Sequence, residues 1–184
     1  SSFSTLRMLE ALDDPARAQQ MEAARANVIR TMGQLSHFVA DLAQPLHTTV
    51  HHHGWVGENP LGYTTDRGIH SMIDSGVVEM HGLDHGALLA LKPSMRRIGV
   101  REEDAWKAMI AHIERSHTLV EPLYVLEKTG HLEGEAGRGF IAERMNDGAS
   151  TLAGLYYAAW LAARPTPESI ESFERYNPVP ASAE

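Results

Sequence analysis

The stretch that decides the fold runs from Ser36 to Asp74 and reads SHFVADLAQPLHTTVHHHGWVGENPLGYTTDRGIHSMID. It contains five side chains that bind metals well, at successive offsets of 4, 6, 23 and 4 residues: His37, Asp41, His47, His70 and Asp74. Residues four apart lie one above the other on a helix. We therefore expect the first two and the last two of these side chains to form pairs that two helices direct toward one point.

Asp41 is the only formally charged side chain between Met32 and Leu46, a segment rich in apolar residues. This setting predicts a buried carboxylate, which is costly unless something neutralises it. No Lys or Arg lies within one helical turn of Asp41, so a divalent cation is the natural partner. The alternative for any single His-x-x-x-Asp pair is an imidazole that a carboxylate orients. Two pairs together with His47 favour a metal, and mixed His and Asp ligands suit zinc.

The boundaries of the ligand helices follow from the residues that start and stop helices. A long helix should start at Pro15, because proline is favoured at the first helical position. It should end near Ala43, because Pro45 disfavours helix at Gln44 and lacks a backbone N–H. The loop over residues 48–66 has turn chemistry, and a second helix should start near residues 65 and 66.

Five further histidines lie near enough in sequence to reach a metal: His51, His52, His53, His81 and His85. The first three fall in the loop between the two ligand helices and are expected at the rim of a cleft. For them an adventitious metal site and a functional role are both open. For the last two, exposure or simple packing is the commoner outcome.

The two motifs together resemble those of one enzyme superfamily. The run His37-Phe-x-x-Asp41-x-x-Gln44-Pro45-Leu46-His47, followed by Ile69-His70-x-x-x-Asp74, resembles the zinc-dependent phospholipase C and single-strand-specific nuclease superfamily, of the nuclease P-one and S-one type. Every interval among the five ligands agrees with that family. The resemblance covers this region firmly, and the rest of the chain to about residue 163 only as a helical pattern.

The resemblance implies an all-α multi-helix bundle that holds up to three zinc ions in a cleft and hydrolyses phosphodiester bonds by metal-activated water. In that pattern His37 and Asp41 would bind one zinc of a close pair. His47, His70 and Asp74 would hold the remaining zinc and leave positions for water or a phosphate oxygen.

The family completes its close zinc pair with ligands upstream of the motif, and an upstream Asp is the proposed base. The 36 residues before His37 contain no His and no Trp. We therefore expect that the N-terminal part of the family fold is absent, either because the chain is a fragment of a longer protein or because it is a reduced relative whose close pair is built otherwise. We also expect one complete zinc site and no assignable catalytic base. Such a chain would be weakly active or inactive.

The substrate class is a phosphate ester, either a nucleic acid or a phospholipid head group. The 23-residue interval and the residues Gly57, Glu58 and Asn59, which echo a turn of the nucleases, favour a nucleic acid and make Asn59 a substrate-binding candidate. Two other classes stay open: a non-catalytic zinc-stabilised helical module and a helical interaction domain. The resemblance implies a secreted or periplasmic protein, and any signal peptide would lie upstream of Ser1.

Composition bounds the remaining possibilities for this chain of 184 residues. It predicts one helical domain over residues 1–163 and a Pro-rich tail over residues 164–184, extended or disordered. Further helices are expected over residues 1–13, over 102–126 with an interruption at Pro122, and over 135–163. The net charge of -8 argues against a broad basic face for nucleic acid, and the absence of cysteine excludes disulfides and thiolate sites. No apolar run is long enough to span a membrane.

Overall fold

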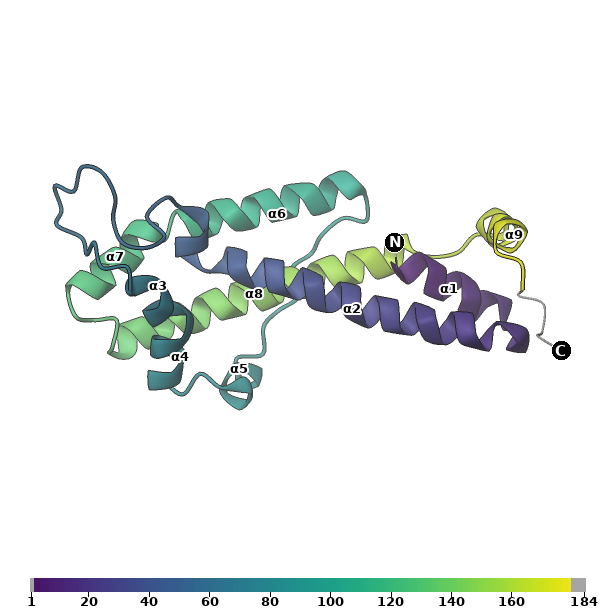
Figure 1. Cartoon of the computed structure of the whole chain (residues 1–184), viewed down its shortest axis with the longest axis horizontal. Coiled ribbons are helices and arrows are strands. Elements are labelled where there is room, and N and C mark those ends of the chain that lie inside the picture. The colour runs from purple at the N-terminus through teal and green to yellow at the C-terminus, as the bar shows by residue number, and fades with distance from the viewer. Residues whose placement is uncertain (1, 180–184) are drawn as a thin grey trace.

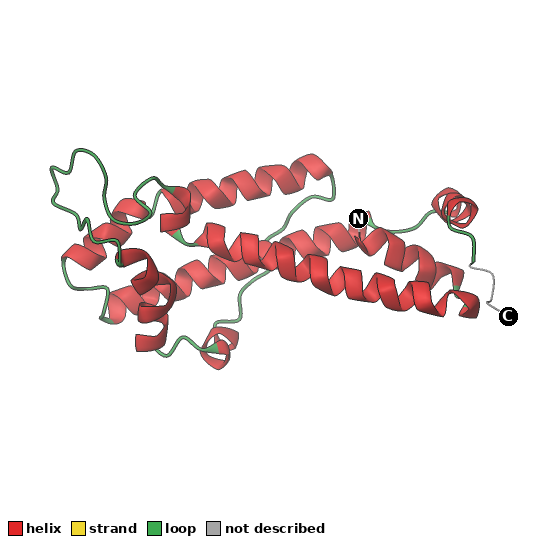
Figure 2. Cartoon of the chain, in the orientation of Figure 1, coloured by secondary structure: helices red, strands yellow, loops and turns green. Residues whose placement is uncertain are grey.

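The computed structural model describes residues 2–179, which form helices and loops without a β-strand (Figures 1 and 2). The α-helices are α1 (Ser2–Leu12), α2 (Ala18–Ala43), α3 (Ile69–Ser71), α4 (Val77–Met80), α5 (His85–Ala90), α6 (Glu102–His117), α7 (Val120–Lys128), α8 (Glu135–Ala162) and α9 (Pro167–Tyr176). Two short 3-10 helices, η1 (Pro15–Arg17) and η2 (Pro45–Thr48), and one π-helical turn, η3 (Met72–Gly76), lie between them. The expected all-α class is confirmed. None of the helices in residues 2–179 has the length and apolar character that a membrane crossing requires.

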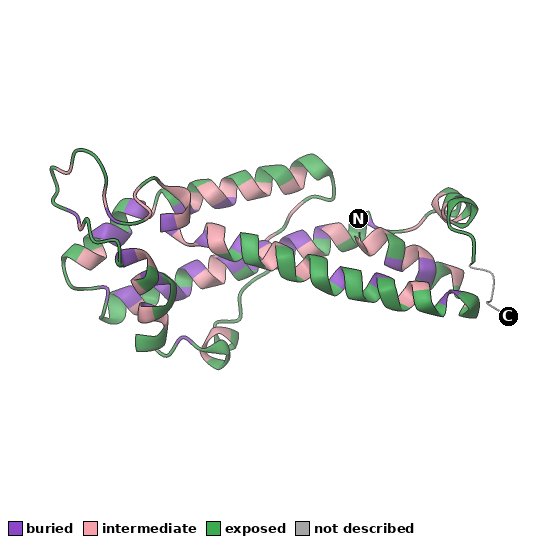
Figure 3. Cartoon of the chain, viewed as in Figure 1, coloured by how far each residue is buried: buried purple, intermediate pink, exposed green. Residues whose placement is uncertain are grey.

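The two long helices α2 and α8 cross and run through the length of the molecule (Figure 1). At one end α1 and α9 pack around a small apolar cluster that includes Leu6, Leu9 and Val28. At the other end α3, α4, α7 and the start of α8 enclose a larger cluster that includes Leu46, Ile73 and Leu123. Figure 3 shows that the first half of α2 exposes most of its residues to solvent. The ligand residues therefore lie at the better packed end.

The end of α2 is where the sequence predicts it. Gln44 leaves the helix with an extended ψ of 119°, and Pro45 opens the next turn, η2. The Gln44 side chain accepts a hydrogen bond from the backbone N–H of Leu46, which caps η2. The chain consequently turns back at once and brings His47 against the residues that follow.

Glycines in α8 allow close packing on both of its sides. A Cβ at Gly148 would lie 3.1 Å from the Cβ of Ala43, so this glycine lets α8 approach α2. At Gly154 the neighbour is the backbone carbonyl of Arg96, in the loop before α6. That loop is held there because the Arg96 N–H donates to the carbonyl of Ser150 at 2.9 Å.

Two boundaries differ from the sequence prediction. The break between α6 and α7 lies at residues 118–119, and Pro122 falls within the first turn of α7, where a missing N–H is tolerated. The prediction of an extended or disordered tail is wrong for residues 167–176, which form α9. Thr166 caps this helix, Pro167 occupies its first position, and Phe173 packs on the α1–α2 cluster. Residues 180–184 of the predicted tail lie outside the described residues.

A buried polar cluster joins α6 to α2 and α8. His112 is fully buried, its Nε2 donates to the Val39 carbonyl at 3.0 Å, and its Nδ1 lies 3.1 Å from Asp147 Oδ2. Burial by itself raises the pKa of Asp147, but Arg115, Arg96 and His112 outweigh it, so the pKa of this carboxyl lies below its usual value. The cluster stabilises the wall behind the ligand residues.

Candidate metal centre

Three short elements bring His47, His70 and Asp74 together. His47 lies on η2, His70 on α3 and Asp74 on η3. The distances are 2.9 Å from His47 Nε2 to His70 Nε2, 2.7 Å from His70 Nε2 to Asp74 Oδ2, and 3.6 Å from His47 Nε2 to Asp74 Oδ2. We call this set the His47 site, and it could hold a metal ion.

The spacing of these atoms agrees with one face of a tetrahedron around a small cation. Ligand bonds of about 2.0–2.1 Å at tetrahedral angles place ligand atoms roughly 3.3 Å apart. The three observed distances lie on both sides of that value. The two imidazoles are mostly buried, and the Asp74 side chain is 41% exposed, which leaves one side of the site open.

The segment that carries His70 and Asp74 departs from a regular helix. The helix begins at Ile69, later than the predicted start near residue 66, because the side chain of Asp66 first closes a turn by accepting the N–H of Gly68. The next turn is π-helical and contains Asp74. Such turns are rare and occur often at functional sites.

Gln44 is a site residue whose role the sequence analysis missed. Its Nε2 donates to Asp74 Oδ1 at 2.9 Å and orients the carboxylate toward the two imidazoles. Partners of this kind fix metal ligands in place. The available signal was the position of Gln44, directly before the proline that stops α2.

His37 and Asp41 form a separate pair, with 3.3 Å between His37 Nε2 and Asp41 Oδ2. The predicted burial of Asp41 is wrong, because its side chain is 37% exposed and that of His37 is 70% exposed. The predicted meeting of both pairs at one point is also wrong, since neither residue belongs to a potential metal group among residues 2–179. Water in a cavity can solvate the Asp41 carboxylate in place of the cation that burial would have required.

A cavity of about 640 Å³ connects the two ligand pairs. Its polar lining includes His37, Asp41, Gln44, His47, Asp74 and Arg144, and its apolar floor includes Val39, Ile73, Val78, Leu88, Ile141, Met145 and Leu152. Arg144 is buried, and its Nε and Nη1 atoms find no hydrogen-bond acceptor among the described residues. The cavity thus offers both potential metal ligands and a cation.

The three histidines of the loop, His51, His52 and His53, separate into two sets. His52 and His53 lie beside His70 and form a second potential metal group with it. His51 faces elsewhere: its ring stacks on Trp55 at 3.8 Å, and its Nδ1 accepts the N–H of Val56.

His81 and His85 take no part in either group among the described residues. His81 donates from Nε2 to the Leu132 carbonyl at 3.0 Å, and His85 is exposed at the start of α5. Packing and exposure are therefore the outcomes for these two side chains.

Asn59 has a structural part in the loop. Its Nδ2 donates to the Tyr63 carbonyl at 2.7 Å, and its Oδ1 accepts the Tyr63 N–H at 2.8 Å. Asn59 is not among the residues that line the cavity. Its predicted contact with substrate therefore gains no support from this geometry.

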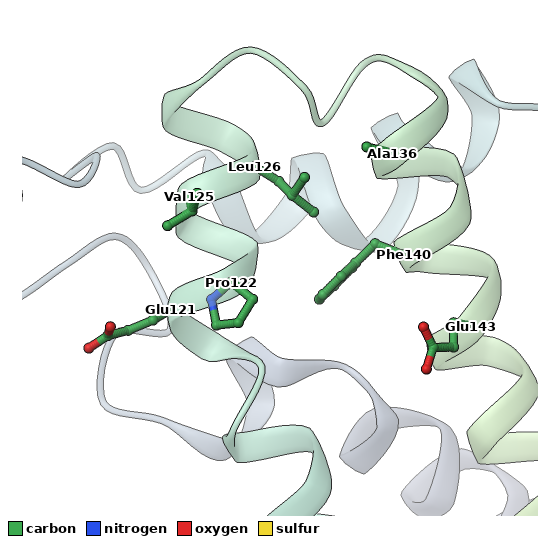
Figure 4. A pocket seen from close by; sticks show the side chains of 7 residues that line it. All are labelled: Glu121, Pro122, Val125, Leu126, Ala136, Phe140 and Glu143. Carbon is green, nitrogen blue, oxygen red and sulfur yellow. The ribbon is translucent and has the colours of Figure 1, made fainter.

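Another hollow, of about 580 Å³, lies between α7 and α8. Leu126 and Phe140 point into it from the two helices, and Glu121 points outward (Figure 4). Its two carboxylates, Glu121 and Glu143, belong to no potential metal group among residues 2–179.

Comparison with protein-family models, curated proteins and solved structures found no match to this chain.

Proposed function

We propose that this chain is a zinc-dependent phosphoesterase, with zinc held by His47, His70 and Asp74. The observation that carries the proposal is the convergence of these three ligand atoms within 3.6 Å of one another, beside a cavity that Arg144 also lines. The agreement of the motif spacing with the phospholipase C and nuclease superfamily supports the same conclusion.

The donor set suits zinc. Two imidazole nitrogens and one carboxylate oxygen are characteristic of catalytic zinc sites with three protein ligands and one open position. When bound, zinc supplies a Lewis acid that activates water and neutralises charge on a phosphoryl group. The chain contributes the orientation of that site, because Gln44 holds the free oxygen of Asp74.

Positive charge behind the cavity wall favours an anionic ligand. Asp147 forms ion pairs with Arg96, Arg115 and Arg144, and the exposed Glu143 forms a second one with Arg144 at 3.2 Å, so two carboxylates face three guanidinium groups. The excess positive charge reaches the cavity because Arg144 is part of its lining, although the whole chain carries a net charge of -8. Local fields of this kind concentrate anions in a cleft.

The substrate class that we propose is a phosphodiester, with a nucleic acid favoured over a phospholipid head group. A volume of about 640 Å³ accommodates one phosphoester together with a nucleoside or a head group. Activity should be slow, because the family's close zinc pair needs ligands that these 184 residues do not supply. A secreted or periplasmic location belongs to the same proposal and rests on the family resemblance alone.

The experiment measures zinc per chain by elemental mass spectrometry, and then hydrolysis of bis(p-nitrophenyl) phosphate and of single-stranded DNA. We expect one tightly held zinc per chain and slow hydrolysis that disappears with EDTA, returns with zinc and is lost in Asp74→Asn. Bound zinc without hydrolysis would overturn the enzyme proposal and leave a zinc-stabilised module. No bound zinc would overturn the site as well.

A further inference from the structure

The loop between the two ligand helices turns two of its three histidines toward His70. The ring centroids of His52 and His70 are 4.1 Å apart, those of His53 and His70 5.1 Å, and those of His52 and His53 4.3 Å. One nitrogen from each ring lies within 4.8 Å of the others. We call this set the three-histidine group.

The backbone orients the imidazole of His52. His52 Nδ1 lies 3.0 Å from the Leu46 carbonyl, so it donates there and leaves Nε2 as the free ligand atom. Metal-binding histidines typically use their second nitrogen in this way, which fixes the tautomer and the ring direction.

The turn after His53 places the adjacent residues His52 and His53 on the side of the loop that faces His70. Gly54 has a φ of +93°, and a Cβ there would lie 2.6 Å from the backbone of Thr65. Trp55 N–H then donates to the Thr64 carbonyl at 2.8 Å. The loop is therefore fixed to the segment that precedes α3, and the two loop rings are held beside His70.

We propose that the three-histidine group is a second metal position, selective for Cu²⁺, which competes with the His47 site for the shared residue His70. His70 Nε2 already lies 2.7 Å from Asp74 and 2.9 Å from His47, so it faces the first site. A neutral imidazole binds one ion through one nitrogen. The two positions are consequently alternatives for a single ion.

Cu²⁺ binds either donor set more tightly than Zn²⁺, and the preference for Cu²⁺ is larger where every donor is an imidazole nitrogen. The three-histidine group offers only imidazole nitrogens, whereas the His47 site includes a carboxylate. Cu²⁺ binds nitrogen ligands more tightly than the other divalent ions of the first transition series. Copper should therefore draw His70 toward the loop and displace zinc from the His47 site.

The test measures Cu²⁺ affinity by chelator competition, nitrogen ligation by electron paramagnetic resonance, and Zn²⁺ affinity, none of which requires hydrolysis. His53 is exposed and absent from the His47 site, so His53→Ala is the informative variant. His51→Ala is the matched control from the same triplet, and Asp74→Asn is the converse variant.

We expect His53→Ala to weaken Cu²⁺ binding by at least about tenfold and to remove one nitrogen from the spectrum, with Zn²⁺ affinity unchanged. Asp74→Asn should weaken Zn²⁺ alone, and His51→Ala should change neither affinity. Copper added to the zinc-loaded protein should release zinc. Unchanged Cu²⁺ affinity in His53→Ala would overturn the second position, and simultaneous tight binding of both ions would overturn the sharing of His70.

Discussion

Replacement of Asp74 by asparagine should separate metal binding from folding in the His47 site. In the metal-free protein this side chain is 41% exposed, and partly exposed ion pairs of this kind contribute about 0–1 kcal/mol. For a chain of this length, that predicts a melting temperature within about 4 °C of the native protein. Asparagine also keeps an oxygen that can accept from Gln44.

The rise in melting temperature on adding zinc should differ much more between the native protein and Asp74→Asn. At a free zinc concentration of about 100 times Kd, binding stabilises the native protein by about 2.7 kcal/mol. This corresponds to a rise of about 5–11 °C in melting temperature for a chain of 150–250 residues. If the lost carboxylate weakens affinity by about 100-fold, the stabilisation at the same zinc concentration falls to about 0.4 kcal/mol, or about 1–2 °C.

Differential scanning calorimetry with and without zinc measures both quantities. Asp41→Asn is the matched control, because it makes the same chemical change in the same cavity but outside the His47 site. It should keep the full zinc-dependent rise. An equal rise in Asp74→Asn, or its loss in Asp41→Asn, would refute the assignment of Asp74 as a ligand.

Three other predictions address the scaffold. The pKa of Asp147 is lowered in the folded protein, so its stabilising effect is present above about pH 4 and is lost as pH falls through the folded pKa. Asp147→Asn should thus make stability lower at neutral pH and less dependent on pH below 4, as urea unfolding at several pH values would show. Gly54→Ala should cost at least about 2 kcal/mol by urea unfolding, because a Cβ would meet the Thr65 backbone at a φ of +93°. Phe173→Ala should cost about 1–3 kcal/mol, and a smaller loss would mean that α9 does not dock on α1.

Local interactions explain what the sequence predicted well. The end of α2 depends on Gln44 and Pro45 alone, since proline restricts the residue before it and lacks a donor. The pairing of His70 with Asp74 needs only a separation of four residues along a helical segment. Both features could be read from the order of residues.

The prediction of an extended or disordered tail failed because it considered the number of prolines and not their positions. Prolines near the end of the chain indicated an extended segment, but Pro167 occupies the first position of α9, where a proline favours helix. The helix is held by contact with residues of α1 and α2 more than 130 positions earlier, which composition does not reveal.

The sequence by itself determined that this protein is helical, where its long helices end, and which side chains are equipped to bind a metal. Only the tertiary structure decided which of them meet. It brought His47 to His70 across 23 residues, left Asp41 partly exposed on the wall of the cavity, and turned His52 away from its neighbour His51. The physical reason is that helix spans depend on interactions within a few residues, whereas the meeting of side chains depends on how separate elements pack and turn.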